Sequence, residues 1–103
     1  ALYGAWQKIV PVQKAAGNES TAYDIVGPIC ESADALGKNR SLNINAGDLL
    51  AIKSAGAYGF VMSSNYNTRP RAPEIMINGS EVHLIRERET VSDLFQNEYL
   101  LPD

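Results

Sequence analysis

Turn-forming residues interrupt this chain at short intervals, and their spacing constrains its fold more than any other feature of the sequence. Strong bend or turn signals occur at Gly27-Pro28, at 45–47 and at Asn78-Gly79, with further signals at 37–39 and at two prolines near 70. Between them lie short runs rich in β-branched and aromatic residues, as in strands. We therefore expect a mainly β fold of five or six strands with one or two short helices, arranged as a β-barrel or a sandwich-like domain.

The runs between the turn signals predict the individual elements. Pro11 marks the first run as an edge strand, because proline cannot donate to a ladder, and the segment 33–47 is predicted to be turn and loop. The run at 48–52 reads as a buried strand, and the last strand, with its alternating polarity, as half-solvated. The terminal helix should present one apolar face, with Thr90 or Ser92 as its N-cap. Strands are predicted at 5–12, 23–31, 48–52, 74–78 and 81–87, and short helices near Gly56 and over 90–100.

Length, charge and cysteine content exclude several classes of protein. The 103 residues suffice for one domain, residues 1–103, and 9 Lys+Arg against 12 Asp+Glu give a net charge of −3. That balance argues against binding to nucleic acid or to an anionic membrane, and no window approaches the roughly 18 apolar residues of a membrane span. A single cysteine and no secretory signal favour the reducing cytoplasm. The chain opens on Ala1 without a methionine, so we expect a processed protein or a piece of a longer one.

Two short motifs could carry chemistry. Cys30 and Glu31 follow the Gly27-Pro28 bend, where a thiol beside a carboxylate could act as an acid or a nucleophile. The alternative is a small buried hydrophobe, the usual environment of a lone cysteine. Tyr58 lies among glycines and alanines, where its hydroxyl could donate to a phosphate oxygen or simply anchor a tight corner.

The remaining polar and aromatic residues are less specific. Tyr3 could pack a first strand or cap a cleft, and the segment 63–67 reads as a ligand loop or, more simply, as turn chemistry. His83 is expected on the surface. No set of His, Cys, Asp and Glu has the spacing of metal ligands, so we expect no metal site.

Taken together, four segments resemble the C-terminal domain of the diaminopimelate decarboxylases, pyridoxal 5′-phosphate enzymes with the alanine racemase-like fold (type III). They are ALYGAWQ at 1–7, YDIVGPICES at 23–32, GDLLAIKSAGAYGFVMSSNYNTRPRAPEIM at 47–76 and HLIRERET at 83–90. The resemblance covers nearly the whole chain in order. It implies conversion of meso-2,6-diaminopimelate to L-lysine and CO₂ in lysine biosynthesis. It also implies a homodimer with a shared active site, and a separate N-terminal (β/α)₈ barrel whose lysine holds the cofactor.

The resemblance assigns roles to four residues of this sequence. It implies that Tyr3 binds substrate, that Cys30 donates a proton, and that Glu31 binds the distal end of the substrate. Tyr58 would touch both substrate and cofactor phosphate. A free thiol, with an ordinary pKa of about 8.5, can donate a proton at neutral pH. A carboxylate gives a distal ammonium a charge-assisted partner.

Two alternatives stay open at this point. One is a decarboxylase of the ornithine or arginine type, against which Glu31 argues, because those enzymes typically carry Asp after the cysteine. The other is a free-standing β module without catalysis. Under the leading hypothesis, the isolated chain should be inactive and should self-associate through apolar surfaces that otherwise contact the barrel.

Overall fold

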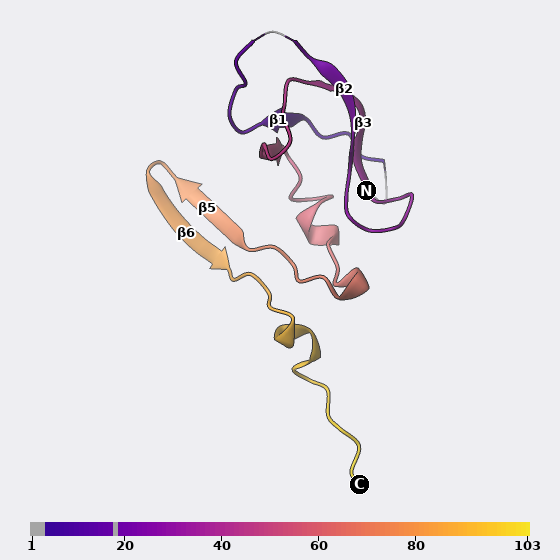
Figure 1. Cartoon of the computed structure of the whole chain (residues 1–103). Helices are drawn as coiled ribbons and strands as arrows, with labels where there is room; N and C mark the ends of the chain where they lie inside the picture. The colour runs from indigo at the N-terminus through magenta and orange to yellow at the C-terminus, as the bar shows by residue number, and fades with distance from the viewer. Residues whose placement is uncertain (1–3, 18) are drawn as a thin grey trace. The chain divides into compact units, whose positions relative to one another are not determined.

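The computed structural model describes residues 4–17 and 19–103 (Figure 1). It divides into two compact units, Ala1–Met62 and Ser63–Asp103. Strands make up most of the regular structure, and the helices among the described residues are short 3₁₀ turns. The mainly β prediction is therefore confirmed. None of the described helices has the length and apolar character that crossing a membrane requires.

The first unit contains two antiparallel strand pairs. β1 (Ile9–Pro11) pairs with β4 (Leu50–Ile52), and β2 (Thr21–Val26) pairs with β3 (Ala35–Leu42). The predicted strands at 5–12 and 23–31 are shorter than expected, and the second ends just before the Gly27-Pro28 bend. β4 is half-buried rather than buried.

The longest strand of the chain, β3, lies inside the segment 33–47 that the turn signals assigned to loops, so that prediction is wrong. The signal at 37–39 forms a bulge within the strand instead of a turn. Asn39 takes a positive φ of 49°, and its N–H donates to the Asp24 carboxylate across the ladder at 2.8 Å. Pairing with β2 thus places residues 37–39 in a strand, although their sequence alone would favour a turn.

The core of the first unit is small and lies where β1 packs against β3. Ile9 and Leu42 are the buried hydrophobic residues of the described chain, at 6% and 7% exposure. Gly37 permits this contact, because a Cβ there would lie 2.9 Å from Ile9 Cδ1. Arg40 adds a polar link, donating to the Gln7 carbonyl at 2.9 Å while its guanidinium lies 4.5 Å from the Trp6 ring centroid.

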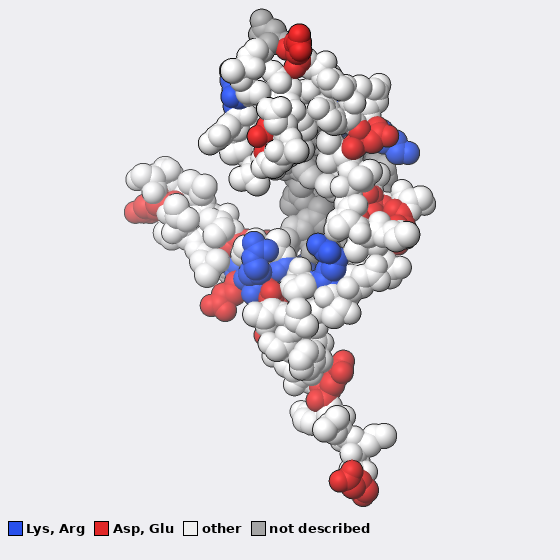
Figure 2. Space-filling model, viewed as in Figure 1, with Lys and Arg blue, Asp and Glu red and all other residues white. Residues whose placement is uncertain are grey.

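The second unit is built on a β-hairpin, as predicted. β5 (Glu74–Asn78) and β6 (Glu81–Arg86) pair antiparallel, and Gly79 takes the positive φ of 62° that a tight turn requires. The prediction that the second strand of the hairpin is half-solvated is wrong, because every residue of β6 is exposed. Exposed apolar side chains occur on both arms: Ile75, Met76, Ile77, Val82, Leu84 and Ile85. Most of the surface visible in Figure 2 belongs to uncharged residues.

The terminal helix is shorter than its apolar periodicity suggests. Only η3 (Ser92–Phe95) forms, as a 3₁₀ turn, and Tyr99 beyond it is 90% exposed. Ahead of it, the Thr90 N–H donates to the Asp93 carboxylate at 2.7 Å and the Asp93 N–H donates to Thr90 Oγ1 at 3.3 Å. This reciprocal exchange satisfies N–H groups at the helix start, so Thr90 has the capping function that the sequence suggests, although η3 itself begins at Ser92.

Candidate functional site

The loop at 27–34, between β2 and β3, carries Cys30 and Glu31. Backbone hydrogen bonds close it tightly: the Gly27 N–H donates to the Asp34 carbonyl at 2.8 Å, and the Asp34 N–H donates to the Glu31 carbonyl at 3.1 Å. Both Cys30 and Glu31 are exposed at its tip. The buried-hydrophobe interpretation of Cys30 is therefore wrong, and consecutive residues of this loop expose a thiol and a carboxylate.

Sequence reasoning missed Asp34 at the base of this loop. One of its carboxylate oxygens, Oδ2, accepts a hydrogen bond from the Ile29 N–H at 2.7 Å. The carboxylate lies against Gly27, where any Cβ would collide with it. The available signal was an aspartate just before a strand, a residue type that commonly bonds nearby backbone N–H groups in turns.

Tyr58 lies in a compact turn that leads into η1 (Phe60–Met62). The Phe60 N–H donates to the Ala55 carbonyl at 2.9 Å, and the absence of a side chain at Gly59 allows this approach, because a Cβ would collide with that carbonyl oxygen. The predicted short helix thus begins four residues after Gly56. The Tyr58 side chain is 58% exposed, so the turn displays the phenol instead of burying it.

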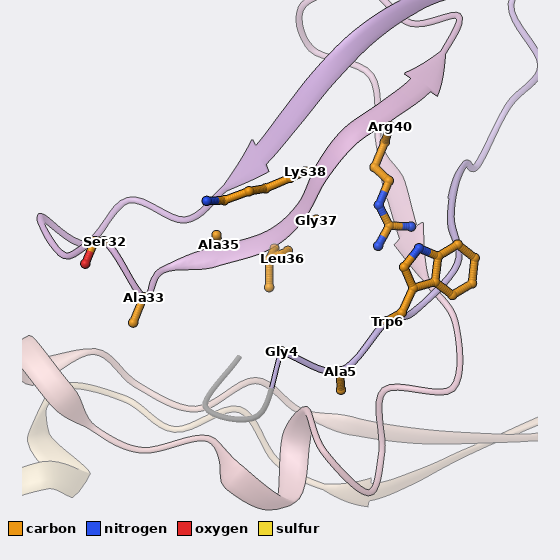
Figure 3. A pocket seen from close by; sticks show the side chains of 10 residues that line it. All are labelled: Gly4, Ala5, Trp6, Ser32, Ala33, Ala35, Leu36, Gly37, Lys38 and Arg40. Atoms are coloured by element: carbon orange, nitrogen blue, oxygen red, sulfur yellow. The ribbon is translucent and has the colours of Figure 1, made fainter.

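An open depression of about 370 Å³ lies beside the Cys30 loop (Figure 3). Gly4 to Trp6, the loop residues Ser32 and Ala33, and the β3 segment with Lys38 and Arg40 line it. Tyr3 lies outside the described residues, but its neighbour Gly4 is part of this lining. The structure thus brings the segment after Tyr3 and the segment after Glu31 to one depression, whereas Cys30, Glu31 and Tyr58 are not among its lining residues.

In the second unit, the segment 63–67 leads into the short 3₁₀ helix η2 (Tyr66–Thr68) and is held by a polar network. Asn65 Nδ2 and the Arg71 N–H both donate to Glu89 Oε2 at 2.7 Å, and Arg71 Nε donates to Ser63 Oγ at 2.8 Å. The Arg71 backbone bond, the Asn65 amide and the nearby Arg71 and Arg86 charges hold the pKa of Glu89 below its ordinary value, against partial desolvation. These contacts support the turn interpretation of this segment.

The described residues contain no group of three or more His, Cys, Asp and Glu side chains placed to hold a metal ion. His83 projects from the exposed hairpin, with its Nε2 atom 3.4 Å from the Glu81 carboxylate. It lies on the surface, as the sequence suggests.

Comparison with known proteins matches residues 1–56 to the family described as pyridoxal-dependent decarboxylase, C-terminal sheet domain. The diaminopimelate decarboxylase of Vibrio cholerae is 54% identical over all 103 residues, which span 24% of that protein. The diaminopimelate decarboxylase of Archaeoglobus fulgidus is 44% identical over 101 residues, 97% of this chain and 24% of the relative. The chain therefore spans about a quarter of the length of these relatives.

Solved structures show the same relationship. A crystal structure of diaminopimelate decarboxylase from M. jannaschii in complex with L-lysine matches 98% of this chain and 23% of that one, at 39% identity and a TM-score of 0.88. The Helicobacter pylori enzyme complexed with L-lysine matches 94% of this chain and 24% of its own, at 38% identity and a TM-score of 0.83.

Proposed function

Because this chain belongs to the pyridoxal-dependent decarboxylases as a C-terminal sheet domain, we propose that it is the C-terminal part of a diaminopimelate decarboxylase. The reaction would convert meso-2,6-diaminopimelate to L-lysine and CO₂. The observation that carries the proposal is identity of 44–54% to enzymes of that name over 97–100% of the chain. Relatives crystallised with L-lysine agree with lysine as the product.

The chemistry of the exposed side chains suits a pyridoxal 5′-phosphate enzyme. A phenol hydroxyl can donate a hydrogen bond to a phosphate oxygen, and Tyr58 presents its exposed phenol from a turn of small residues. Tyr58 would hold the cofactor phosphate and contact the substrate. When bound, the cofactor supplies the electron sink for loss of CO₂. The lysine that holds the cofactor lies outside this chain.

Cys30 is the proposed proton donor. After CO₂ leaves, the α-carbon needs a proton, and a thiol can supply it at neutral pH. The exposed position of Cys30 at the loop tip allows it to reach into a site completed by another part of the protein. In this role Cys30 acts as a general acid and needs no local histidine to activate it.

Glu31 is the proposed determinant of substrate choice. Its exposed carboxylate would accept a charge-assisted hydrogen bond from the distal ammonium of diaminopimelate. Tyr3 would contribute a further substrate contact, and the position of its neighbour Gly4 at the depression beside the Cys30 loop supports that role.

The partners follow from the same proposal. The domain would contact the N-terminal (β/α)₈ barrel of its own enzyme and complete an active site shared across a cytoplasmic homodimer. The exposed apolar side chains of the β5–β6 hairpin support burial against another protein surface. No role in binding nucleic acid or membranes is proposed.

The test is a substrate comparison with the complete enzyme. We expect turnover of meso-diaminopimelate in preference to ornithine and arginine. Glu31→Ala should raise the KM for diaminopimelate about 10- to 100-fold, because a hydrogen bond to a charged group contributes about 1.5–3 kcal/mol. Glu19→Ala, which removes an exposed carboxylate elsewhere in the same unit, is the matched control. Preference for ornithine would reject diaminopimelate as the substrate. Lack of turnover of diaminopimelate, ornithine and arginine alike would favour a non-catalytic module.

A further inference from the structure

We propose that Asp34 is a positioning residue for the proton donor, holding the loop at 27–34 so that Cys30 and Glu31 face the reacting substrate. This inference rests on the proposed function, because it assigns Asp34 a task only if Cys30 donates the proton. It concerns the geometry of the loop and not a further contact with substrate.

The first argument is the pattern of hydrogen bonds around Cys30. The Asp34 carboxylate accepts from the Ile29 N–H at 2.7 Å, one residue before Cys30, and the Asp34 N–H donates to the Glu31 carbonyl at 3.1 Å, one residue after it. A single residue therefore holds both sides of Cys30. The Gly27 N–H donating to the Asp34 carbonyl at 2.8 Å closes the base of the loop.

The second argument is the close approach at Gly27. The Asp34 carboxylate occupies the space where a side chain at Gly27 would be, so the two residues are sterically matched. The loop also lacks the support of a core, since both buried hydrophobic residues of the described chain, Ile9 and Leu42, belong to strands. Asp34 is half-buried, and its carboxylate bonds the loop backbone at the Ile29 N–H. Placement of Cys30 thus depends on a polar contact.

Removing this contact should act on catalysis through Cys30. In the complete enzyme, Asp34→Ala should lower kcat about 10- to 100-fold, as small displacements of a catalytic group do, and it should also weaken the substrate contact of Glu31 and raise KM. Asp34→Asn keeps an oxygen that can accept from the Ile29 N–H and should restore most of kcat. Gly27→Ala should reproduce the defect with Asp34 intact, because the new Cβ displaces the carboxylate.

Asp24→Ala is the matched control. Asp24 makes the same kind of contact in the same hairpin, accepting from the Asn39 N–H at 2.8 Å, but at the bulge of β3. A purely structural role for Asp34 predicts that both alanine variants lower thermal stability and activity alike. Positioning predicts a loss of kcat with Asp34→Ala alone.

A double-variant cycle gives the sharpest result. If Asp34 acts through Cys30, adding Asp34→Ala to Cys30→Ala should lower kcat no further, whereas general destabilisation should lower it in both backgrounds. Unchanged kcat in Asp34→Ala would overturn the proposal, as would an Asp34→Asn variant no better than alanine. If Asp34→Ala does not fold, normal kcat in Gly27→Ala refutes the positioning role. Retained turnover in Cys30→Ala itself would instead refute the proton donor of the proposed function.

Discussion

At the scale of single residues, the exposed Cys30 thiol is the group whose removal should matter most to the chemical step. Cys30→Ala in the complete enzyme should lower kcat by about 10²- to 10⁴-fold, the usual contribution of a positioned general acid, with little change in KM. Steady-state kinetics with meso-diaminopimelate measures both. Cys30→Ser, which keeps a much weaker acid at the same position, should fall between wild type and alanine. A rise in KM at constant kcat would mean that Cys30 binds substrate without donating a proton.

The candidate residues could be named from the sequence because their types and order are specific. Their exposure and their contacts in the folded chain could not be predicted in the same way. The exposure of Cys30 depends on the loop formed between β2 and β3, and no local pattern distinguishes an exposed lone cysteine from a buried one. Asp34 escaped notice for a similar reason. Its importance comes from a contact with the Ile29 N–H and from the space left by Gly27, and both depend on the folded loop.

At the scale of elements, Glu89 joins the segment around Asn65 and Arg71 to the residues that follow β6. Its pKa is lowered chiefly by the Arg71 backbone N–H, so the folded form favours the carboxylate. A carboxyl group of depressed pKa stabilises the fold above the unfolded value, ordinarily 4.5 for glutamate, and loses that effect as pH falls through the folded value. We therefore expect the polar network to weaken below pH 4.5 and to be intact at pH 7.

Hydrogen exchange followed by mass spectrometry on the complete enzyme can measure this. After correction for the intrinsic pH dependence of exchange, protection of the Arg71 amide should be lower at a pH below 4.5, where pH falls through the depressed pKa of Glu89, than at pH 7. Glu89→Gln should flatten that dependence, since a glutamine does not titrate. Glu81→Gln removes an exposed carboxylate that faces His83 and is the control. Equal protection of Arg71 at both pH values in wild type would contradict a network held by the Glu89 carboxylate.

The hairpin and β3 show why some elements could be predicted and others not. The β5–β6 hairpin follows from local signals alone, two apolar runs around a glycine turn, and it forms as expected. β3 contains turn signals that a local rule assigns to loops, yet cross-strand pairing with β2 converts them into a bulge. Likewise η3 is cut short because apolar periodicity supports a longer helix only where a partner surface covers it.

At the scale of the whole molecule, the described chain buries few apolar side chains and exposes many. Two hydrophobic residues are buried, whereas Ile77 and Val82 on the hairpin are 70% and 67% exposed. Monomeric proteins rarely leave such contiguous apolar surface bare, so the isolated chain should self-associate. It should also show no turnover of meso-diaminopimelate with added cofactor, because the cofactor lysine belongs to the barrel of the proposed enzyme. Turnover by the isolated chain would refute that division of the site.

Self-association through the hairpin can be tested by a charge pair. Ile77 and Val82 face each other across the strands, so Ile77→Lys with Val82→Glu removes apolar surface while placing opposite charges side by side in the ladder. Light scattering after size-exclusion chromatography should show a smaller species for this variant of the isolated chain. His83→Lys adds a charge to the same hairpin without removing apolar surface and should leave the mass unchanged. If instead the double variant associates as strongly as wild type, the contact lies on other exposed apolar residues, of which the terminal Tyr99, Leu100 and Leu101 are the most exposed at 90–98%.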